Sequence, residues 1–134
     1  MSPYVEIFKE YTKTIQLFGR DHEVKVLIKT EFDDMGHELI DDMDAFTEKE
    51  RQEMHDDLNN GHLDCIGVIV EVSCQYFTGT DSIWGSLVKS RDDIEVILKD
   101  YTLVEIAIKE HELEANRYKD FFDKLGGKSG GKSE

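Results

Sequence analysis

The sequence predicts an α+β fold: a small antiparallel sheet of about three strands with a long C-terminal helix packed on one face. Three observations lead to this prediction. Residues 23–32 alternate between apolar and polar side chains, residues 64–77 form a nearly continuous β-branched run, and apolar residues recur at helical spacing over residues 104–125. We expect a single domain over residues 1–125 and a flexible Gly/Ser/Lys-rich tail over residues 126–134.

The N-terminal segment favours a helix, although a strand competes with it. Ser2 and Pro3 are typical of a helix start, and Gly19 can end the helix. Between them, apolar side chains recur at helical spacing: Tyr4, Ile7, Phe8, Tyr11, Ile15 and Phe18. The alternative is a strand over residues 12–18, in which Ile15 and Leu17 share one face.

Residues 23–32 predict a half-buried strand, which ends in a turn at residues 33–36. A short apolar stripe follows, and Thr47 then predicts the cap of a second short helix. Glu50 lies three residues after Thr47 and completes a capping box. The sequence Asn-Asn-Gly at residues 59–61 ends this helix, which we expect to lie between the first two predicted strands.

Residues 64–77 predict the central strand of the sheet, and residues 82–89 predict a third strand that forms a hairpin with it. We expect residues 78–81 to be the loop between them. Ser90 then predicts the cap of a helix, and residues 104–125 predict the long closing helix.

Acidic side chains are concentrated in residues 31–57, where twelve acidic residues accompany only two basic ones, giving a charge of −10 out of −14 for the chain. Such a localised charge repels nucleic acid and anionic membranes and attracts basic protein surfaces. We therefore predict that acidic residues of this segment bind a basic partner: Asp33, Asp34, Glu38, Asp41, Asp42, Asp44, Glu48, Glu53, Asp56 and Asp57. The competing interpretations are a solvated face that only keeps the protein soluble and, with less support, cation binding, because residues 41–48 only partly match a calcium loop.

Other classes of function have less support. A pI near 4.7 without a basic patch disfavours nucleic-acid binding. No apolar run is long enough for a membrane span and no signal peptide is visible, so we expect a cytoplasmic protein.

The two cysteines, Cys65 and Cys74, lie nine residues apart in one predicted strand. They should therefore point to opposite faces and remain unpaired structural thiols.

No catalytic or metal site is expected. The serine and cysteine residues lie in no nucleophile motif, and no glycine-rich phosphate loop occurs. His55, His62 and Cys65 fit no standard zinc spacing, and His111 is expected to be a core or interface histidine. We therefore predict a non-enzymatic protein that holds neither a cofactor nor a metal, with an enzyme of unrecognised type as a minor alternative.

Two further sites come from aromatic residues. Trp84 stands beside small residues in the third predicted strand, where it can belong to the core or close a pocket for a small ligand or signalling nucleotide. The predicted C-terminal helix is longer than a three-stranded sheet is wide. We therefore expect Tyr118, Phe121 and Phe122 to be partly uncovered and to join two copies in a homodimer.

The order of these patterns resembles small uncharacterised acidic proteins of tailed bacteriophages. The resemblance rests on the segments 32–36, 66–72 and 81–85, followed by Asp93-Ile94 and a long closing helix, and it covers roughly residues 23–118. It transfers no functional residue. It implies only a setting in the host cytoplasm, where small acidic phage proteins often act on host proteins and several inhibit nucleases by mimicking DNA. The leading hypothesis is thus an acidic inhibitor of a host defence or nucleic-acid-binding protein, and the alternative is a small-ligand binder.

Overall fold

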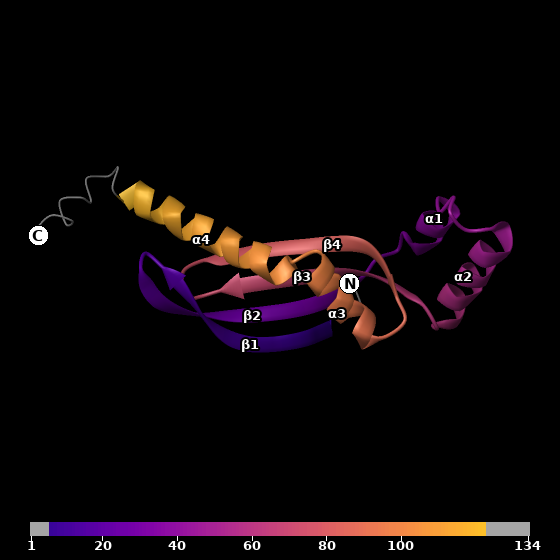
Figure 1. Cartoon of the computed structure of the whole chain (residues 1–134), viewed down its shortest axis with the longest axis horizontal. Helices are drawn as coiled ribbons and strands as arrows, with labels where there is room; N and C mark the ends of the chain where they lie inside the picture. Colours follow the sequence, from indigo (N-terminus) through magenta and orange to yellow (C-terminus); the bar gives the residue numbers. More distant parts are fainter. Residues whose placement is uncertain (1–5, 123–134) are drawn as a thin grey trace, which may run out of the picture.

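The computed structural model describes residues 6–122 of the chain, and the side chains of residues 6–120. Within that range the chain forms, in order, β1 (Glu6–Leu17), β2 (Arg20–Phe32), α1 (Gly36–Asp41), α2 (Glu48–Asn60), β3 (Asp64–Ser73), β4 (Thr78–Val88), α3 (Arg91–Asp100) and α4 (Leu103–Phe122). The strands form one antiparallel sheet in the order β1-β2-β3-β4. Figure 1 shows α4 crossing one face of the sheet and α1 and α2 beyond one end of it. The predicted α+β class is confirmed, with four strands in place of about three.

The additional strand is β1, and the prediction of an N-terminal helix is wrong over the described residues. β1 pairs with β2 along nearly its whole length, from Glu6 opposite Thr30 to Leu17 opposite Arg20. The two-residue turn between them places Phe18 at φ 54° and Gly19 at φ 77°, which is the backbone of a tight hairpin turn. Pairing with the free edge of β2 therefore overrides the helical spacing. The predicted start at Ser2 and Pro3 lies outside the described residues.

The core lies between the sheet and the helices α3 and α4. Alternate residues of β2 and β3 face it, and their register places Val26 opposite Val72 and Ile28 opposite Val70. The buried cluster consists of Phe8, Val24, Val26, Ile28, Ile66, Val68, Val70, Val72, Val88, Ile94, Leu98, Leu103 and Ala107. The alternation that predicted β2 thus identifies its buried face.

The predicted hairpin of β3 and β4 is confirmed, but its turn is not where the sequence placed it. Residues 78–81 belong to β4, and Gly79 pairs with Val72. The chain reverses instead at residues 74–77, where the Cys74 amide donates a hydrogen bond to the Phe77 carbonyl (3.0 Å). This shift brings Gly79 under α4 and moves Cys74 to the end of the sheet.

The helix α4 runs close over β4, and Gly79 allows the close approach. A Cβ atom on Gly79 would lie 2.1 Å from the His111 amide nitrogen and 2.5 Å from the Ala107 carbonyl oxygen. Ala107 and His111 are fully buried at this contact. The absence of a side chain at Gly79 therefore sets the distance between helix and sheet, and it places His111 over the end of β3.

Candidate functional site

The acidic residues stand on a separate helical unit, which we call the lobe and define as residues 33–63, containing α1 and α2. Figure 1 shows the lobe projecting from the end of the sheet at which β2 ends and β3 begins. Thr47 and Glu50 form the predicted capping box at the start of α2, and Gly61 ends the helix in a left-handed conformation. Because no residue of α2 is fully buried, this helix displays most of its side chains to solvent.

The loop between α1 and α2 is held by Arg51. Its guanidinium donates hydrogen bonds to the carbonyl oxygens of Met43 (3.0 Å) and Phe46 (2.6 Å), and it also pairs with Glu48 (3.1 Å). One of the two basic residues of the acidic segment is therefore engaged inside the lobe. Its charge orders the loop, and it therefore neutralises little of the negative charge of the carboxylates on the outer surface.

A chain of hydrogen bonds fastens α1 to α2. His37 Nε2 faces Asn59 Oδ1 (3.1 Å), the Nδ1 atoms of His37 and His55 lie 2.6 Å apart, and His55 Nε2 faces Asp41 Oδ1 (2.7 Å). His37 and Asp41 belong to α1, and His55 and Asn59 belong to α2, so these contacts tie the two helices together.

Most of the predicted partner-binding carboxylates are exposed. In residues 31–57 the exposed acidic side chains are Asp34, Glu38, Asp41, Asp42, Asp44, Glu48, Glu50, Glu53 and Asp56. Within the described part of the chain, five of these make neither a side-chain hydrogen bond nor an ion pair: Asp34, Glu38, Asp42, Asp44 and Glu53. Asp57 is half-buried and lies 4.0 Å from His62. The lobe therefore carries negative charge that its own basic groups do not neutralise.

Asp33 has a different position from the other predicted partner-binding residues. Its carboxylate is half-buried and accepts hydrogen bonds from the backbone amides of Met35 (3.1 Å) and Gly85 (2.8 Å). Gly85 lies in β4 with φ 72°, so Asp33 joins the start of the lobe to a left-handed position in the sheet. It thus anchors the lobe, a role that the sequence did not indicate.

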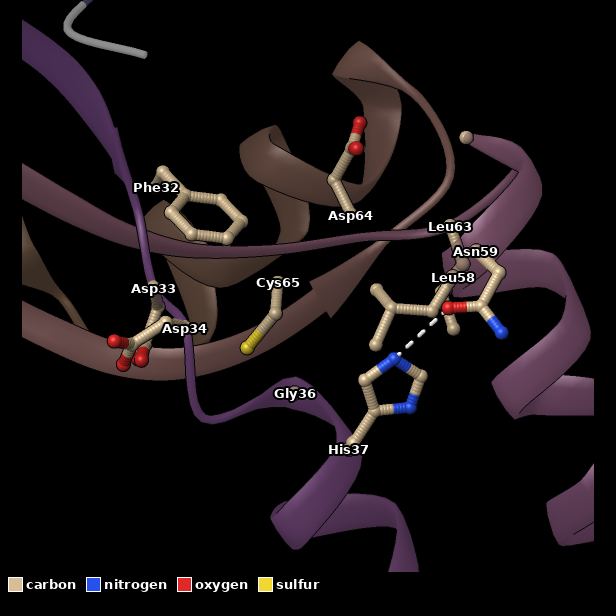
Figure 2. A pocket seen from close by; sticks show the side chains of 11 residues that line it. Phe32, Asp33, Asp34, Gly36, His37, Leu58, Asn59, Leu63, Asp64 and Cys65 are labelled. Atoms are coloured by element: carbon tan, nitrogen blue, oxygen red, sulfur yellow. Dashed lines mark hydrogen bonds between the residues drawn. The ribbon is translucent and has the colours of Figure 1, made fainter. Parts of the chain in front are cut away.

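A hollow of about 270 Å³ lies where the lobe meets the sheet, and Figure 2 shows its lining. Asp33, Asp34 and Asp64 contribute carboxylates, and Cys65 lies at its inner wall. Burial raises the pKa of the Cys65 thiol to about 11, and the neighbouring charges of Asp33 and Asp34 add to the rise. The acidic lining disfavours phosphate-bearing ligands, and Cys65 is held as a neutral thiol.

The two cysteines are unpaired, as predicted, but their surroundings differ. Because Cys65 is buried with a raised pKa and Cys74 is half-buried, we expect alkylation of the metal-free protein near pH 8 to label Cys74 and leave Cys65 unmodified. Mass spectrometry of tryptic peptides measures this difference. Equal labelling of the two thiols in the folded protein would show that Cys65 is accessible.

The predicted pocket residue Trp84 lies on the sheet face opposite to α4. A Cβ atom on Gly67 would lie 2.3 Å from the Trp84 ring, so the indole packs directly over this glycine. Trp84 remains 48% exposed and lines none of the three hollows described for this structure. Because Gly67 has no side chain, the indole packs against its backbone. Small-ligand binding at Trp84 stays a prediction.

The residues predicted for self-association lie at the end of α4. Tyr118 is 44% exposed and its ring packs on Phe77, with 5.0 Å between the ring centroids. The side chains of Phe121 and Phe122 lie outside the described residues. Figure 1 shows this end of α4 extending past the sheet, which is the arrangement from which the homodimer was predicted.

Three possible metal ligands meet at the other end of the sheet from the lobe. His22 near the start of β2, Cys74 after β3 and His111 in α4 place their ligand atoms within 4.8 Å of one another. His55, His62 and Cys65, whose spacing in the sequence fits no standard zinc motif, do not form such a group in the described residues. No motif spacing could have identified the observed set, because its members come from three separate elements.

No protein-family model matches the chain, and no curated protein or solved structure is significantly similar to it. The resemblance to phage proteins therefore stays a prediction. None of the helices in residues 6–122 is long and apolar enough to cross a membrane.

Proposed function

We propose that the chain is a non-enzymatic binding protein whose lobe docks on a basic protein surface. The observation that carries this proposal is the group of five exposed carboxylates that have no partner among the described residues, on a unit that projects from the sheet. Like charges gathered on one small unit repel each other in the free protein, and a cationic partner removes that repulsion. Complementary charge also raises the rate of encounter with such a partner.

Exposed apolar side chains among the acids support a protein as the partner. Met35 is 47% exposed and Phe46 is 41% exposed, and both stand in the lobe beside the carboxylates. Aromatic and methionine side chains surrounded by polar groups are typical of the centre of a protein–protein interface. The surface therefore suits a groove that combines basic residues with an apolar contact.

A nucleic-acid-binding protein is the partner class that we favour. On α2, Glu48, Glu50, Glu53, Asp56 and Asp57 span about 14 Å at 1.5 Å per residue, or one carboxylate per roughly 3 Å. One DNA strand carries a phosphate charge per about 3.4 Å. Because these carboxylates are spread around α2, the comparison concerns the density of charge along the helix axis and not a row on one face. A phage inhibitor of a host defence protein would belong to this class.

The test replaces carboxylates that have no role inside the molecule. Glu38→Gln, Asp42→Asn, Asp44→Asn and Glu53→Gln together remove four charges from the lobe and no hydrogen bond of the described structure. We expect this variant to bind the partner at least about tenfold more weakly and with a smaller salt dependence, because each exposed charge contributes up to about 1 kcal/mol. The partner is first captured with wild-type protein, then purified and titrated calorimetrically at low and high salt.

A matched control removes the same charge elsewhere. Asp92→Asn, Asp100→Asn, Glu110→Gln and Glu112→Gln are exposed positions of α3 and α4 that likewise make no side-chain bond in the described residues. This control variant should bind like wild type. Equal weakening by both variants would mean that only the net charge matters, and no weakening by the lobe variant would refute docking through the lobe.

A further inference from the structure

We propose that His22, Cys74 and His111 form a zinc site that joins β2, the β3–β4 turn and α4. The Nε2 atoms of His22 and His111 lie 3.3 Å apart, and the three side chains each place one ligand atom within 4.8 Å of the other two. Tetrahedral zinc, with bonds of about 2.0–2.1 Å to nitrogen and about 2.3 Å to sulfur, needs ligand separations of about 3.3 Å between nitrogens and about 3.6 Å from nitrogen to sulfur. The two nitrogens already meet this requirement, and a small movement of the Cys74 side chain completes it.

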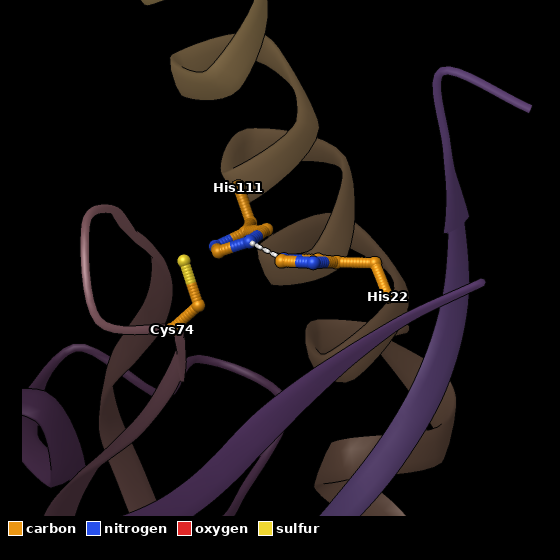
Figure 3. Close-up of side chains that lie close together, drawn as sticks. All are labelled: His22, Cys74 and His111. Atoms are coloured by element: carbon orange, nitrogen blue, oxygen red, sulfur yellow. Dashed lines mark hydrogen bonds between the residues drawn. The ribbon is translucent and has the colours of Figure 1, made fainter. Parts of the chain in front are cut away.

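His111 is oriented as a metal ligand should be. Its Nδ1 lies 3.1 Å from the Val72 carbonyl oxygen and donates to it, so its Nε2 accepts a hydrogen bond from His22 in the metal-free protein, and zinc would take the place of that proton. Figure 3 shows the His111 ring between His22 and Cys74. A backbone carbonyl that fixes the second nitrogen is the usual support of a zinc-bound imidazole.

Burial also fixes the position of His111, because its ring is fully buried over the end of β3.

Cys74 is placed by a tight turn. Its amide donates to the Phe77 carbonyl (3.0 Å), and the Tyr76 amide donates to Cys74 Sγ (3.4 Å). The hydrogen bond from the Tyr76 amide holds the sulfur in position. The turn at residues 74–77, in place of the predicted loop at residues 78–81, thus brings Cys74 to the end of the sheet.

Two imidazoles and one thiolate favour zinc over the hard cations that prefer oxygen ligands. A hollow lined by His22, Cys74 and Tyr76 lies beside the site and gives the ion a path from solvent. The described residues supply three ligands, so water would take the fourth tetrahedral position. This proposal replaces the expectation of a chain without metal, and it is independent of partner binding by the lobe.

The test titrates the reduced, tag-free protein with Co²⁺ and then Zn²⁺. We expect one Co²⁺ per chain, with a thiolate-to-cobalt charge-transfer band and the intense visible bands of a four-coordinate ion. Zn²⁺ should remove these bands, bind with a submicromolar Kd in competition with a chromophoric chelator, and protect Cys74 from alkylation. Cys74→Ser and His22→Gln should each weaken zinc binding more than tenfold, since each removes one of three ligands.

Control variants separate this site from the other histidine and cysteine residues. His62→Gln and Cys65→Ala remove a side chain that is not in the group and should leave zinc affinity unchanged. Circular dichroism shows whether each variant is folded. A folded wild-type protein without a thiolate-to-cobalt band, or zinc affinity equal in wild type and folded Cys74→Ser, would overturn the proposal. If a ligand variant does not fold, the cobalt spectrum and the zinc protection of Cys74 in wild type decide.

Discussion

Replacing Gly79 by alanine is expected to lower the free energy of unfolding by more than about 3 kcal/mol. The added Cβ would lie 2.1 Å from the His111 amide nitrogen and 2.6 Å from the His111 Cα, so it meets helix backbone and not a flexible side chain. Only a shift of α4 away from β4 removes the collision, and that shift opens the contact at the fully buried Ala107. Since small domains have about 5–15 kcal/mol of total stability, the loss is large.

Gly67→Ala is the matched control because it is the same substitution in the same hairpin. The Cβ added at Gly67 would meet the ring of Trp84, which is half-exposed and can rotate away. We therefore expect a smaller loss, of about 1 kcal/mol. Urea denaturation measures both variants, with a lower midpoint at an unchanged m-value for Gly79→Ala. Equal midpoints for Gly79→Ala and wild type would show that α4 does not rest on β4 as closely as the structure indicates.

The sequence predicts the elements whose signals are local. The alternation in β2, the β-branched run of β3 and the capping box of Thr47 and Glu50 all depend on residues close together in the chain, and the structure confirms them. The prediction of a helix over the residues of β1 is wrong for a physical reason. The apolar residues of β1 fit helical spacing, but the available edge of β2 offers a long row of backbone hydrogen bonds, with one irregularity between Ile7 and Lys9, that a helix cannot use.

The candidate sites also differ in whether their residues are close together or far apart in the sequence. The acidic lobe is visible in the sequence because its charges are consecutive, whereas the anchoring of Asp33 to Gly85 joins residues 52 positions apart. His22, Cys74 and His111 are likewise separated by 52 and 37 positions. Their meeting depends on β2 beginning at Arg20 and so including His22, on the turn at residues 74–77 and on the close approach at Gly79. The first two of these differ from what the sequence predicts, and the third follows from the second.

Ile40→Ala is expected to open the lobe while leaving the sheet folded. Ile40 is fully buried, yet it does not belong to the main core cluster, so the lobe has a small core of its own. Truncation of a buried isoleucine costs about 2–5 kcal/mol. Since α1 has only six residues, it cannot stay helical without that packing. Amide hydrogen exchange should therefore show lost protection in α1 and α2 and retained protection in β2 and β3.

Ile28→Ala provides the comparison, because Ile28 belongs to the main core. We expect it to lower protection throughout the described elements. Uniform loss of protection in Ile40→Ala as well would show that lobe and sheet unfold as one unit.

Local opening of the lobe also bears on partner binding. Ile40→Ala changes no charge, so weaker partner binding by this variant would mean that the carboxylates act through their fixed positions on α1 and α2, and not through net charge alone.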